Sequence, residues 1–544
     1  MKFFKIILGI TALFNFAQAQ ISNESLRPKS IEFGEYINAS IPEYSFDIAR
    51  TSIDSIIHGS RRAYQISLLH ATSINTTTQG IWSTLPNGDK IWRLKIQSPK
   101  ALGLNLYFSK YELAPGATLH IYSPSYKKIL GAYTSRNHDA SNLFATSIIE
   151  GESCIIEYYE PRDMHIEQPF EISEIAHYFR GLKSAENFND AESCLVNVTC
   201  SEGDSFRLVN KAVVRILAKN ITGTVWCTGT IMNNTAQDCK PYVLTAAHCA
   251  EGTTEAQFNQ WIYYFNYESP TCANPSNEPS TKSIAGSIVR AQSIDGGDSS
   301  SDFCFVELKS AIPTSYQANF AGWSNANVPS VKSVSINHPV GDIKKIATSQ
   351  IPTNSVSYGG FIQNTHWKAS WSNTPNGNSF TMGGSSGSTL LNRNGLVVGT
   401  LTGGPTVDCN TIAIFDYYGK MSVHWNPAGS TNSSQRLKEW LDPNNSGVTS
   451  LGLKQGNACP FVSSIQSAQN GMEIKAFIEK NTLHIDGIQT PVQVNITDMQ
   501  GKNMGAYTAD TNRGEISLEH LTMGVYIIRL QAGNAVKTIK FIRA

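Results

Sequence analysis

The chain has little charge, no excess of either sign, and no long apolar run beyond its first residues. Its 544 residues include 43 Lys and Arg and 43 Asp and Glu, so the formal net charge is zero. Nucleic-acid binders and polybasic membrane-surface proteins depend on positive excess, so this balance argues against both classes. Charged residues make up 16% of the chain, against about 25% in an average soluble protein.

The composition also excludes global disorder, collagen and coiled coil, because 41% of the residues are hydrophobic, 10% are aromatic and 22 prolines are scattered along the chain. Ser, Thr, Asn and Gly replace the missing charge, which is typical of many short strands joined by loops. At roughly 150 residues per domain, the length predicts two to four domains. We therefore expect a mainly β protein of several domains.

The N-terminus carries the features of a signal peptide. Lys2 and Lys5 precede an apolar run over residues 6–16, and Ala-Gln-Ala at 17–19 has the small-x-small form of a cleavage site. The run is too short to span a bilayer as a stable helix. The sequence predicts a signal peptide over residues 1–19 and export of the mature chain.

The ten cysteines contain no C-x-x-C pair, so the sequence gives little support to a zinc ribbon. Export favours disulfides instead. Eight of the cysteines lie between positions 194 and 409, and spacing alone leaves their pairing open.

Short strands with period-two alternation are predicted over residues 90–96, 104–108, 119–121 and 154–159, which indicates a small β-sandwich. Residues 195–455 are strand-rich, and residues 456–470 are predicted to be a linker. Further short strands at 492–496 and 524–528 predict a second small β block at the C-terminus.

Three residues follow one another in the order of the chymotrypsin-type catalytic triad. His248 ends an apolar run, Asp302 leads directly into an apolar strand, and Ser386 lies in a Gly/Ser-rich turn at 383–388. Each residue alone has an ordinary structural interpretation, as a core histidine, a strand-initiating turn residue and a flexible loop. Together, and in this order, they predict nucleophilic catalysis.

The chemistry assigns a role to each of these residues. Ser386 is the expected nucleophile, His248 its general base, and Asp302 the carboxylate that fixes the imidazole tautomer. Gly384 and Gly387 allow a tight turn, so that the amides of Gly384 and Ser386 can face the developing oxyanion.

The segments TAAHC at 245–249, SDF at 301–303 and GSSGS at 384–388 resemble the bacterial lysyl endopeptidases, which are secreted serine proteases of chymotrypsin fold. The resemblance covers about residues 184–450 and includes the segments at 403–405, 416–419 and 436–443. It implies a chymotrypsin-like double β-barrel over 184–455, preceded by a β-rich pro-region over 20–183.

The resemblance also implies a specificity pocket. Phe380 stands where trypsin holds a carboxylate, and the family's pocket aspartate falls on Asp416, which favours a cation at the cleavage site. The family's pocket tryptophan and histidine fall on Tyr358 and Thr402, so the balance of Lys against Arg stays open. Residues 399–404, including Gly403 and Gly404, are expected to form the edge on which substrate pairs.

The family implies three disulfides, Cys227–Cys249, Cys194–Cys409 and Cys200–Cys272. We expect a fourth between Cys239 and Cys304, because the strands that carry the triad's His and Asp are expected to pair. The sequence leaves Cys154 and Cys459 unassigned.

Activation is expected to differ from trypsin, because Ser385 occupies the place of the Asp that pairs with a new N-terminus there. Lys183 is a candidate for self-cleavage, although it could equally be an ordinary linker lysine. The pro-region must then restrain or chaperone the enzyme by other contacts.

Residues 471–544 resemble the C-terminal sorting domain of type IX secretion, through the segments at 494–502, 524–529 and 537–541. The resemblance implies secretion machinery as a partner and a final location outside the cell or on its surface, reached through the periplasm. A carbohydrate- or surface-binding module is the alternative for this block.

The sequence thus predicts a secreted, monomeric serine endopeptidase that cuts after Lys, with Arg open, and that acts on proteins and peptides. No cofactor, metal, nucleic acid or membrane span is expected. The alternatives are an inactive homologue acting as an adhesin, and a protease of the same fold with another preference.

Overall fold

The computed structural model describes residues 26–37, 40–57, 63–182, 190–293, 301–405, 407–411, 414–428, 430–459, 475–479, 481–486, 491–498, 502–509, 513–532 and 535–543. The predicted signal peptide, Lys183 and most of the predicted linker lie outside these residues. The chain divides into two compact units, Met1–Pro460 and Phe461–Ala544.

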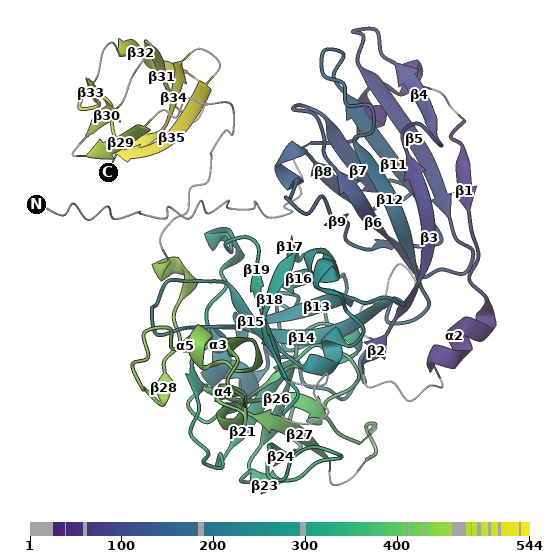
Figure 1. Cartoon of the computed structure of the whole chain (residues 1–544), viewed down its shortest axis with the longest axis vertical. Coiled ribbons are helices and arrows are strands. Elements are labelled where there is room, and N and C mark those ends of the chain that lie inside the picture. Colours follow the sequence, from purple (N-terminus) through teal and green to yellow (C-terminus); the bar gives the residue numbers. More distant parts are fainter. Residues whose placement is uncertain are drawn as a thin grey trace, which may run out of the picture. The chain divides into compact units, whose positions relative to one another are not determined.

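The N-terminal part of the first unit is a β-sandwich (Figure 1). One sheet has the order β1-β5-β11-β7-β8, with β4 on β5, and the other has the order β10-β6-β12-β3, with β9 on β6. Side chains from both sheets share one core, as Trp92, Leu94 and Phe108 show. The strands are β1 (Glu43–Ser45), β3 (Ser67–Asn75), β4 (Ile81–Thr84), β5 (Lys90–Gln97), β6 (Gly103–Tyr111), β7 (Thr118–Tyr122), β8 (Ile129–Tyr133), β9 (Phe144–Ala145), β10 (Ile149–Glu150), β11 (Ser153–Glu160) and β12 (Phe170–Tyr178).

Two further sheets follow, as expected for a double β-barrel. The first has the order β17-β16-β13-β14-β15-β19-β18 and also receives β2 (Tyr64–Gln65) at β14. Its other strands are β13 (Val213–Lys219), β14 (Thr224–Met232), β15 (Tyr242–Thr245), β16 (Ile262–Phe265), β17 (Lys282–Ala285), β18 (Ser287–Gln292) and β19 (Cys304–Leu308).

The second of these sheets has the order β22-β21-β25-β26-β27-β24-β23, and β20 links β26 to β28. Its strands are β20 (Trp323–Ser324), β21 (Ser333–Asn337), β22 (Lys345–Ser349), β23 (Asn354–Val356), β24 (His366–Ser370), β25 (Thr389–Asn392), β26 (Val397–Gly403), β27 (Phe415–Lys420) and β28 (Ser450–Leu451).

Helices are short in the described part of the chain. They are α1 (Lys29–Glu32), α2 (Arg50–Ile57), α3 (Arg207–Asn210), α4 (Met421–Trp425) and α5 (Lys438–Leu441). None of the helices in the described ranges is long and apolar enough to cross a membrane.

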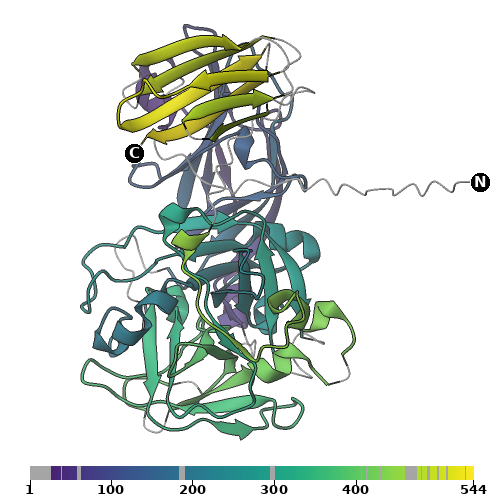
Figure 2. The same cartoon turned by 90° about the vertical axis from the view of Figure 1, so that its left-hand side faces the viewer.

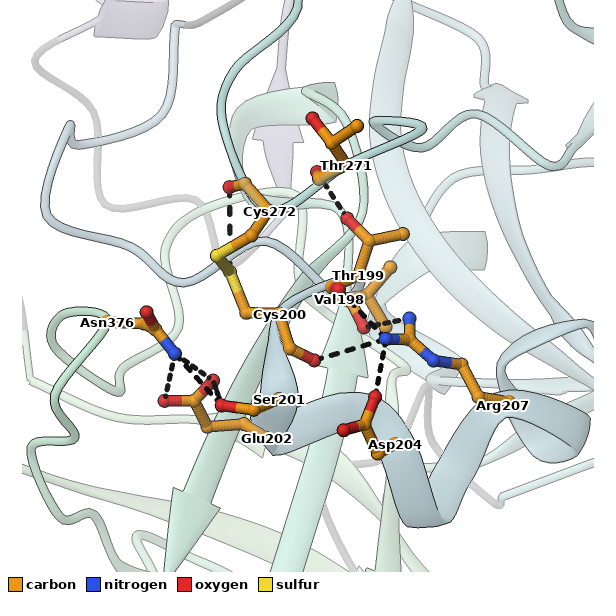
Figure 3. A network of polar contacts seen from close by, with 10 residues as sticks. All are labelled: Val198, Thr199, Cys200, Ser201, Glu202, Asp204, Arg207, Thr271, Cys272 and Asn376. Atoms are coloured by element: carbon orange, nitrogen blue, oxygen red, sulfur yellow. Dashed lines mark hydrogen bonds and ion pairs between the residues drawn. A yellow bond between two sulfur atoms is a disulfide. The ribbon is translucent and has the colours of Figure 1, made fainter.

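Four disulfides cross-link the first unit, and three of them are the pairs implied by the family: Cys194–Cys409, Cys200–Cys272 and Cys227–Cys249. The second of these lies in a polar network in which Arg207 donates to the carbonyls of Val198, Thr199 and Cys200 (Figure 3). In the same network, the Asn376 amide donates to Ser201 and Glu202.

The expected Cys239–Cys304 disulfide is wrong, because Cys239 pairs with Cys459 and Cys304 is a buried free thiol, as is Cys154. The register explains the error. Cys304 lies opposite Thr245 in the β15–β19 pair, whereas Cys239 precedes the other end of β15. The Cys239–Cys459 bond ties the start of the predicted linker to the segment before β15.

The second unit is a small β-sandwich, whose strands Figure 2 shows in yellow and green. Its sheets have the orders β29-β30-β33 and β32-β31-β34-β35, and Leu483, Val494 and Ile528 bring both into one core. The strands are β29 (Lys475–Glu479), β30 (Thr482–Asp486), β31 (Val492–Asp498), β32 (Asn503–Ala509), β33 (Arg513–Ser517), β34 (Gly524–Ala532) and β35 (Ala535–Arg543).

Candidate active site

The pairing of β15 with β19 brings His248 and Asp302 together. Thr245 and Cys304 are register partners, so the segment after β15 and the residue before β19 meet at one end of the pair. Asp302 Oδ2 lies 2.7 Å from Nδ1 of His248, and Asp302 Oδ1 accepts the His248 backbone amide at 3.0 Å. Both side chains are buried.

The carboxylate fixes one form of the imidazole. Burial by itself would raise the pKa of Asp302, but the adjacent His248 ring and its hydrogen bonds outweigh burial and hold that pKa below its usual value. An ionised Asp302 accepts a hydrogen bond from Nδ1–H and leaves Nε2 as an acceptor. Nε2 is buried and has no hydrogen-bond partner among the described residues, so it is available to a hydroxyl.

The loop that carries Ser386 is held against β14, the strand that pairs with β15. The Thr228 amide donates to the Ser386 carbonyl at 2.8 Å, and the Thr228 hydroxyl donates to the Gly384 carbonyl at 3.0 Å. Gly384 and Gly387 have positive φ, and a Cβ at Gly387 would lie 2.1 Å from Thr245 Oγ1. Only glycine fits there, because the loop needs both the conformation and the space.

Two amides of this loop are left free. Val340 donates its amide to the Gly383 carbonyl at 2.5 Å, while the amides of Ser385 and Gly387 donate to the carbonyls of Met382 and Leu401. The amides of Gly384 and Ser386 have no acceptor in the described ranges. Two such donors on either side of Ser385 are what an oxyanion hole requires.

Neutral hydrogen bonds hold the loop at Ser385. Its buried hydroxyl donates to Asn337 Oδ1 at 2.8 Å and accepts the Met382 amide at 3.2 Å. This network occupies the place where a trypsin-like enzyme needs an ion pair.

Asp416 is a buried carboxylate on β27 with one occupied oxygen. Trp371 Nε1 and Thr381 Oγ1 donate to its Oδ2 at 2.5 and 2.9 Å. A Cβ at Gly404 would lie 2.0 Å from Oδ1, so the bare glycine leaves space beside that oxygen. Burial raises the pKa of Asp416 to about 6, although its hydrogen bonds act in the opposite direction. No cationic side chain of the described ranges pairs with it.

Tyr358 and Thr402 lie near this pocket, and Thr402 contacts a residue that the sequence did not single out. The Tyr358 ring stacks on Tyr417 with centroids 4.2 Å apart, and its hydroxyl would lie 3.2 Å from a Cβ on Gly403. Thr402 Oγ1 is hydrogen-bonded to His366 Nε2 at 3.1 Å. Burial lowers the pKa of His366 to about 4, so this ring is neutral at pH 7.

The expected substrate edge at 399–404 is shorter than the sequence suggested. Gly399 and Thr400 pair with β25 on one side and β27 on the other, and Leu401 is bonded to Ser388. Residues 402–404 lie beyond this pairing.

Thr228, Val340, Trp371, Thr381 and His366 were all missed from the sequence. Each acts through a contact with a residue far away in the chain, and none belongs to a short motif.

Family models match three segments of the chain. "Lysyl endopeptidase N-terminal domain" matches residues 62–179, "Lysyl endopeptidase, C-terminal domain" matches 188–419, and "Secretion system C-terminal sorting domain" matches 479–543. A lysyl endopeptidase from Pseudomonas aeruginosa is 25% identical over 347 residues, which span 60% of this chain and 71% of the relative.

Among solved structures, the protease Anisep from Arthrobacter nicotinovorans is 15% identical, with a TM-score of 0.29, over 39% of this chain and 90% of its own. An inactive form of Rv3671c from M. tuberculosis is 14% identical, with a TM-score of 0.24, and the match covers 40% of this chain and 84% of that protein. The sorting domain marks the chain for secretion, to the cell surface or the medium. The models of both lysyl endopeptidase domains match, and together they cover most of the first unit. The chain therefore belongs to the lysyl endopeptidase family.

Proposed function

We propose that the chain is a serine endopeptidase that works through His248, Asp302 and Ser386. The observation that carries this proposal is the buried Asp302–His248 pair, which leaves Nε2 of His248 without a partner among the described residues, next to a nucleophile loop with two free amides. A structural histidine in a core normally has both nitrogens satisfied.

In the proposed reaction, Ser386 Oγ attacks the carbonyl carbon of the substrate peptide as its proton passes to His248 Nε2. The amides of Gly384 and Ser386 stabilise the oxyanion. When the tetrahedral intermediate collapses, the C–N bond breaks, the amine takes the proton from His248, and an acyl-enzyme on Ser386 remains. Water then repeats the cycle and releases the acid.

We further propose that Asp416 selects a cation, with Lys preferred. A buried carboxylate without a cation is costly, and an incoming ammonium offsets that cost. Oδ1 beside Gly404 is the oxygen that would accept it, because Oδ2 already accepts two hydrogen bonds. A single compact charge suits one available oxygen better than a planar guanidinium, which prefers two. Tyr358 and Thr402 are the positions that would admit Arg.

The domain limits are part of this proposal. Residues 20–183 form a pro-region, 184–455 with its extension to Cys459 form the protease, and 471–544 are read by the type IX secretion machinery. Release of the pro-region after Lys183 accompanies maturation.

The test is a digest of a mixed peptide library, with cleavage sites determined by mass spectrometry. Cuts after Lys are expected, and the Ser386→Ala variant should lose on the order of a million-fold in turnover. A serine-reactive phosphonate should label the parent chain and not Ser386→Ala. Library cleavage equal to that of Ser386→Ala, together with no labelling, would show an inactive homologue.

A further inference from the structure

A strand from the N-terminal sandwich lies beside the nucleophile loop. Along one side, β14 pairs with β13 from Thr224, opposite Lys219, to Thr230, opposite Val213. On its other side, β15 covers only residues 230–232. The remaining edge of β14 is filled by β2, in which Tyr64 lies opposite Trp226 and Gln65 opposite Val225, antiparallel. The edge thus accepts a short extended segment as an added strand.

This edge leads directly to the reaction centre. Cys227, next along β14, is disulfide-bonded to Cys249 beside His248, and Thr228 donates its amide to the Ser386 carbonyl. The Tyr64 ring packs on the nucleophile loop itself, since a Cβ at Gly383 would lie 2.7 Å from Tyr64 Cδ2. Gly383 immediately precedes the proposed oxyanion donor Gly384.

Several contacts hold the segment in place. The Ile66 amide donates to the Thr224 carbonyl at 2.9 Å, and the Ser67 and Thr224 hydroxyls are 2.7 Å apart. The Arg180 guanidinium lies 4.5 Å above the Tyr64 ring and donates from Nε to the Gln65 carbonyl at 2.7 Å. Gln65 and Ser67 are buried.

The sandwich has a second attachment behind this segment. The buried Lys219 forms an ion pair with the partly exposed Glu174 of β12, and Gln260 donates to the carbonyls of Phe108 and Phe144. An apolar cluster that includes Ile66, Tyr178 and Trp226 crosses the same boundary. The strand is therefore presented by a broad contact rather than by a loose tail.

A peptide substrate has to use both walls of the site. With its carbonyl carbon at Ser386, the residues before the cut lie toward 402–404 and Asp416, and the residues after it must leave along the opposite wall. That wall is the edge of β14 that β2 fills, together with Gly383. We propose that this surface binds the leaving-group side of a peptide substrate as an added strand, and that residues 63–65 occupy it as a built-in inhibitor. The proposal rests on the serine endopeptidase function above.

Two substrates separate this effect from general inhibition. A peptidyl-lysine aminocoumarin ends at the cut in a small leaving group and does not reach β14, whereas a quenched peptide that continues three residues past Lys must displace Tyr64. The measurement is kcat/KM for each substrate with the full chain, whose intactness is checked by mass.

In the Tyr64→Ala variant, kcat/KM for the extended peptide should rise about tenfold or more, because truncating an aromatic anchor commonly costs that much binding. The aminocoumarin rate should change little. Tyr64→Phe, which keeps the ring, should behave as the parent chain, as should Tyr126→Ala, whose tyrosine is exposed elsewhere on the sandwich.

Arg180→Met provides an independent variant in case Tyr64→Ala disturbs folding, and it should move the extended-peptide rate in the same direction. Equal changes for both substrates, or no change in either variant, would overturn the proposal. If kcat/KM for the aminocoumarin were no higher in the parent chain and its variants than in Ser386→Ala, the protease function on which the proposal rests would be refuted instead.

Discussion

Thr228 on β14 holds the nucleophile loop, because its amide donates to the Ser386 carbonyl and its hydroxyl donates to the Gly384 carbonyl. The same hydroxyl accepts the His338 amide at 3.0 Å. One strand residue thus holds the 384–385 peptide unit, which lies between the units that carry the amides of Gly384 and Ser386, and also the 386–387 unit that follows.

Replacing Thr228 by Val should lower kcat about tenfold to a hundredfold with little change in KM, less than loss of an oxyanion donor itself. The reason is that the hydroxyl holds the peptide unit between the two donor amides and does not touch substrate. Thr230→Val is the matched control, since Thr230 lies on the same strand and bonds Thr389 instead. Steady-state kinetics on a Lys peptide distinguish the two, and a rise in KM alone for Thr228→Val would contradict this positioning role.

Asp302→Asn should lower kcat on the order of ten-thousandfold while the fold is kept. An amide at this position donates to Nδ1 of His248, so the proton moves to Nε2 and the base is lost. Binding of a Lys peptide to the inactive variant should persist, which calorimetry can measure. Retention of more than a few per cent of kcat would mean that Asp302 does not set the tautomer.

Denatured but unreduced protein should contain two reactive thiols, from Cys154 and Cys304, because the other eight cysteines are paired. Cys459→Ser should add one thiol at Cys239 and lower the free energy of unfolding by about 2–5 kcal/mol, since the bond closes a very long loop. Cys304→Ser serves as the control and should change neither the pairing nor the activity. Thiol titration and urea unfolding measure both effects.

The sequence foresees elements whose signal is local. The alternation of Trp92, Leu94 and Ile96 predicts β5, and these side chains are indeed in the sandwich core. β3, in contrast, lies in a stretch without clear alternation, because its middle residues are only partly buried. β3 becomes a strand through its pairing with β12, which is a contact between distant segments of the chain.

The candidate site divides in the same way. His248, Asp302 and Ser386 stand in short motifs, so their type and order suffice to select them. Thr228 is one threonine among many in strands, and its partner Gly384 lies 156 residues away. Cys239 and Cys459, separated by 220 residues, share this property. Such contacts depend on tertiary packing, which one sequence does not display.

Cleavage after Lys should weaken as the pH falls below about 6, because the pKa of Asp416 is raised to about that value in the free protein. A protonated Asp416 cannot pair with an ammonium, so binding of a Lys peptide weakens and its KM rises. The expected readout is a KM for a Lys peptide that rises below pH 6, whereas KM for the same peptide with a neutral side chain in place of Lys should not follow this profile. A KM that is flat between pH 5 and 7 would exclude Asp416 as the pocket anion.

Asp416→Asn should abolish the preference for Lys and at the same time stabilise the fold. The folded-state pKa of Asp416, about 6, lies above the value of 3.8 for an unperturbed Asp. The folded protein therefore binds the proton more tightly than the unfolded chain does, and its stability falls as the pH rises through this interval. The neutral amide keeps the acceptor for Trp371 and Thr381 without this loss.

In a Ser386→Ala background, which prevents self-digestion, the Asp416→Asn substitution should raise the free energy of unfolding by about 1–3 kcal/mol at pH 7.5. The difference should vanish near pH 3, where Asp416 is mostly protonated in both states. Asp408→Asn is the control, because Asp408 is exposed and its pKa is lowered by local hydrogen bonds. Equal stability of the chains with and without Asp416→Asn at pH 7.5 would mean that the buried carboxylate already has a compensating partner, and the argument that it awaits a substrate cation would fail.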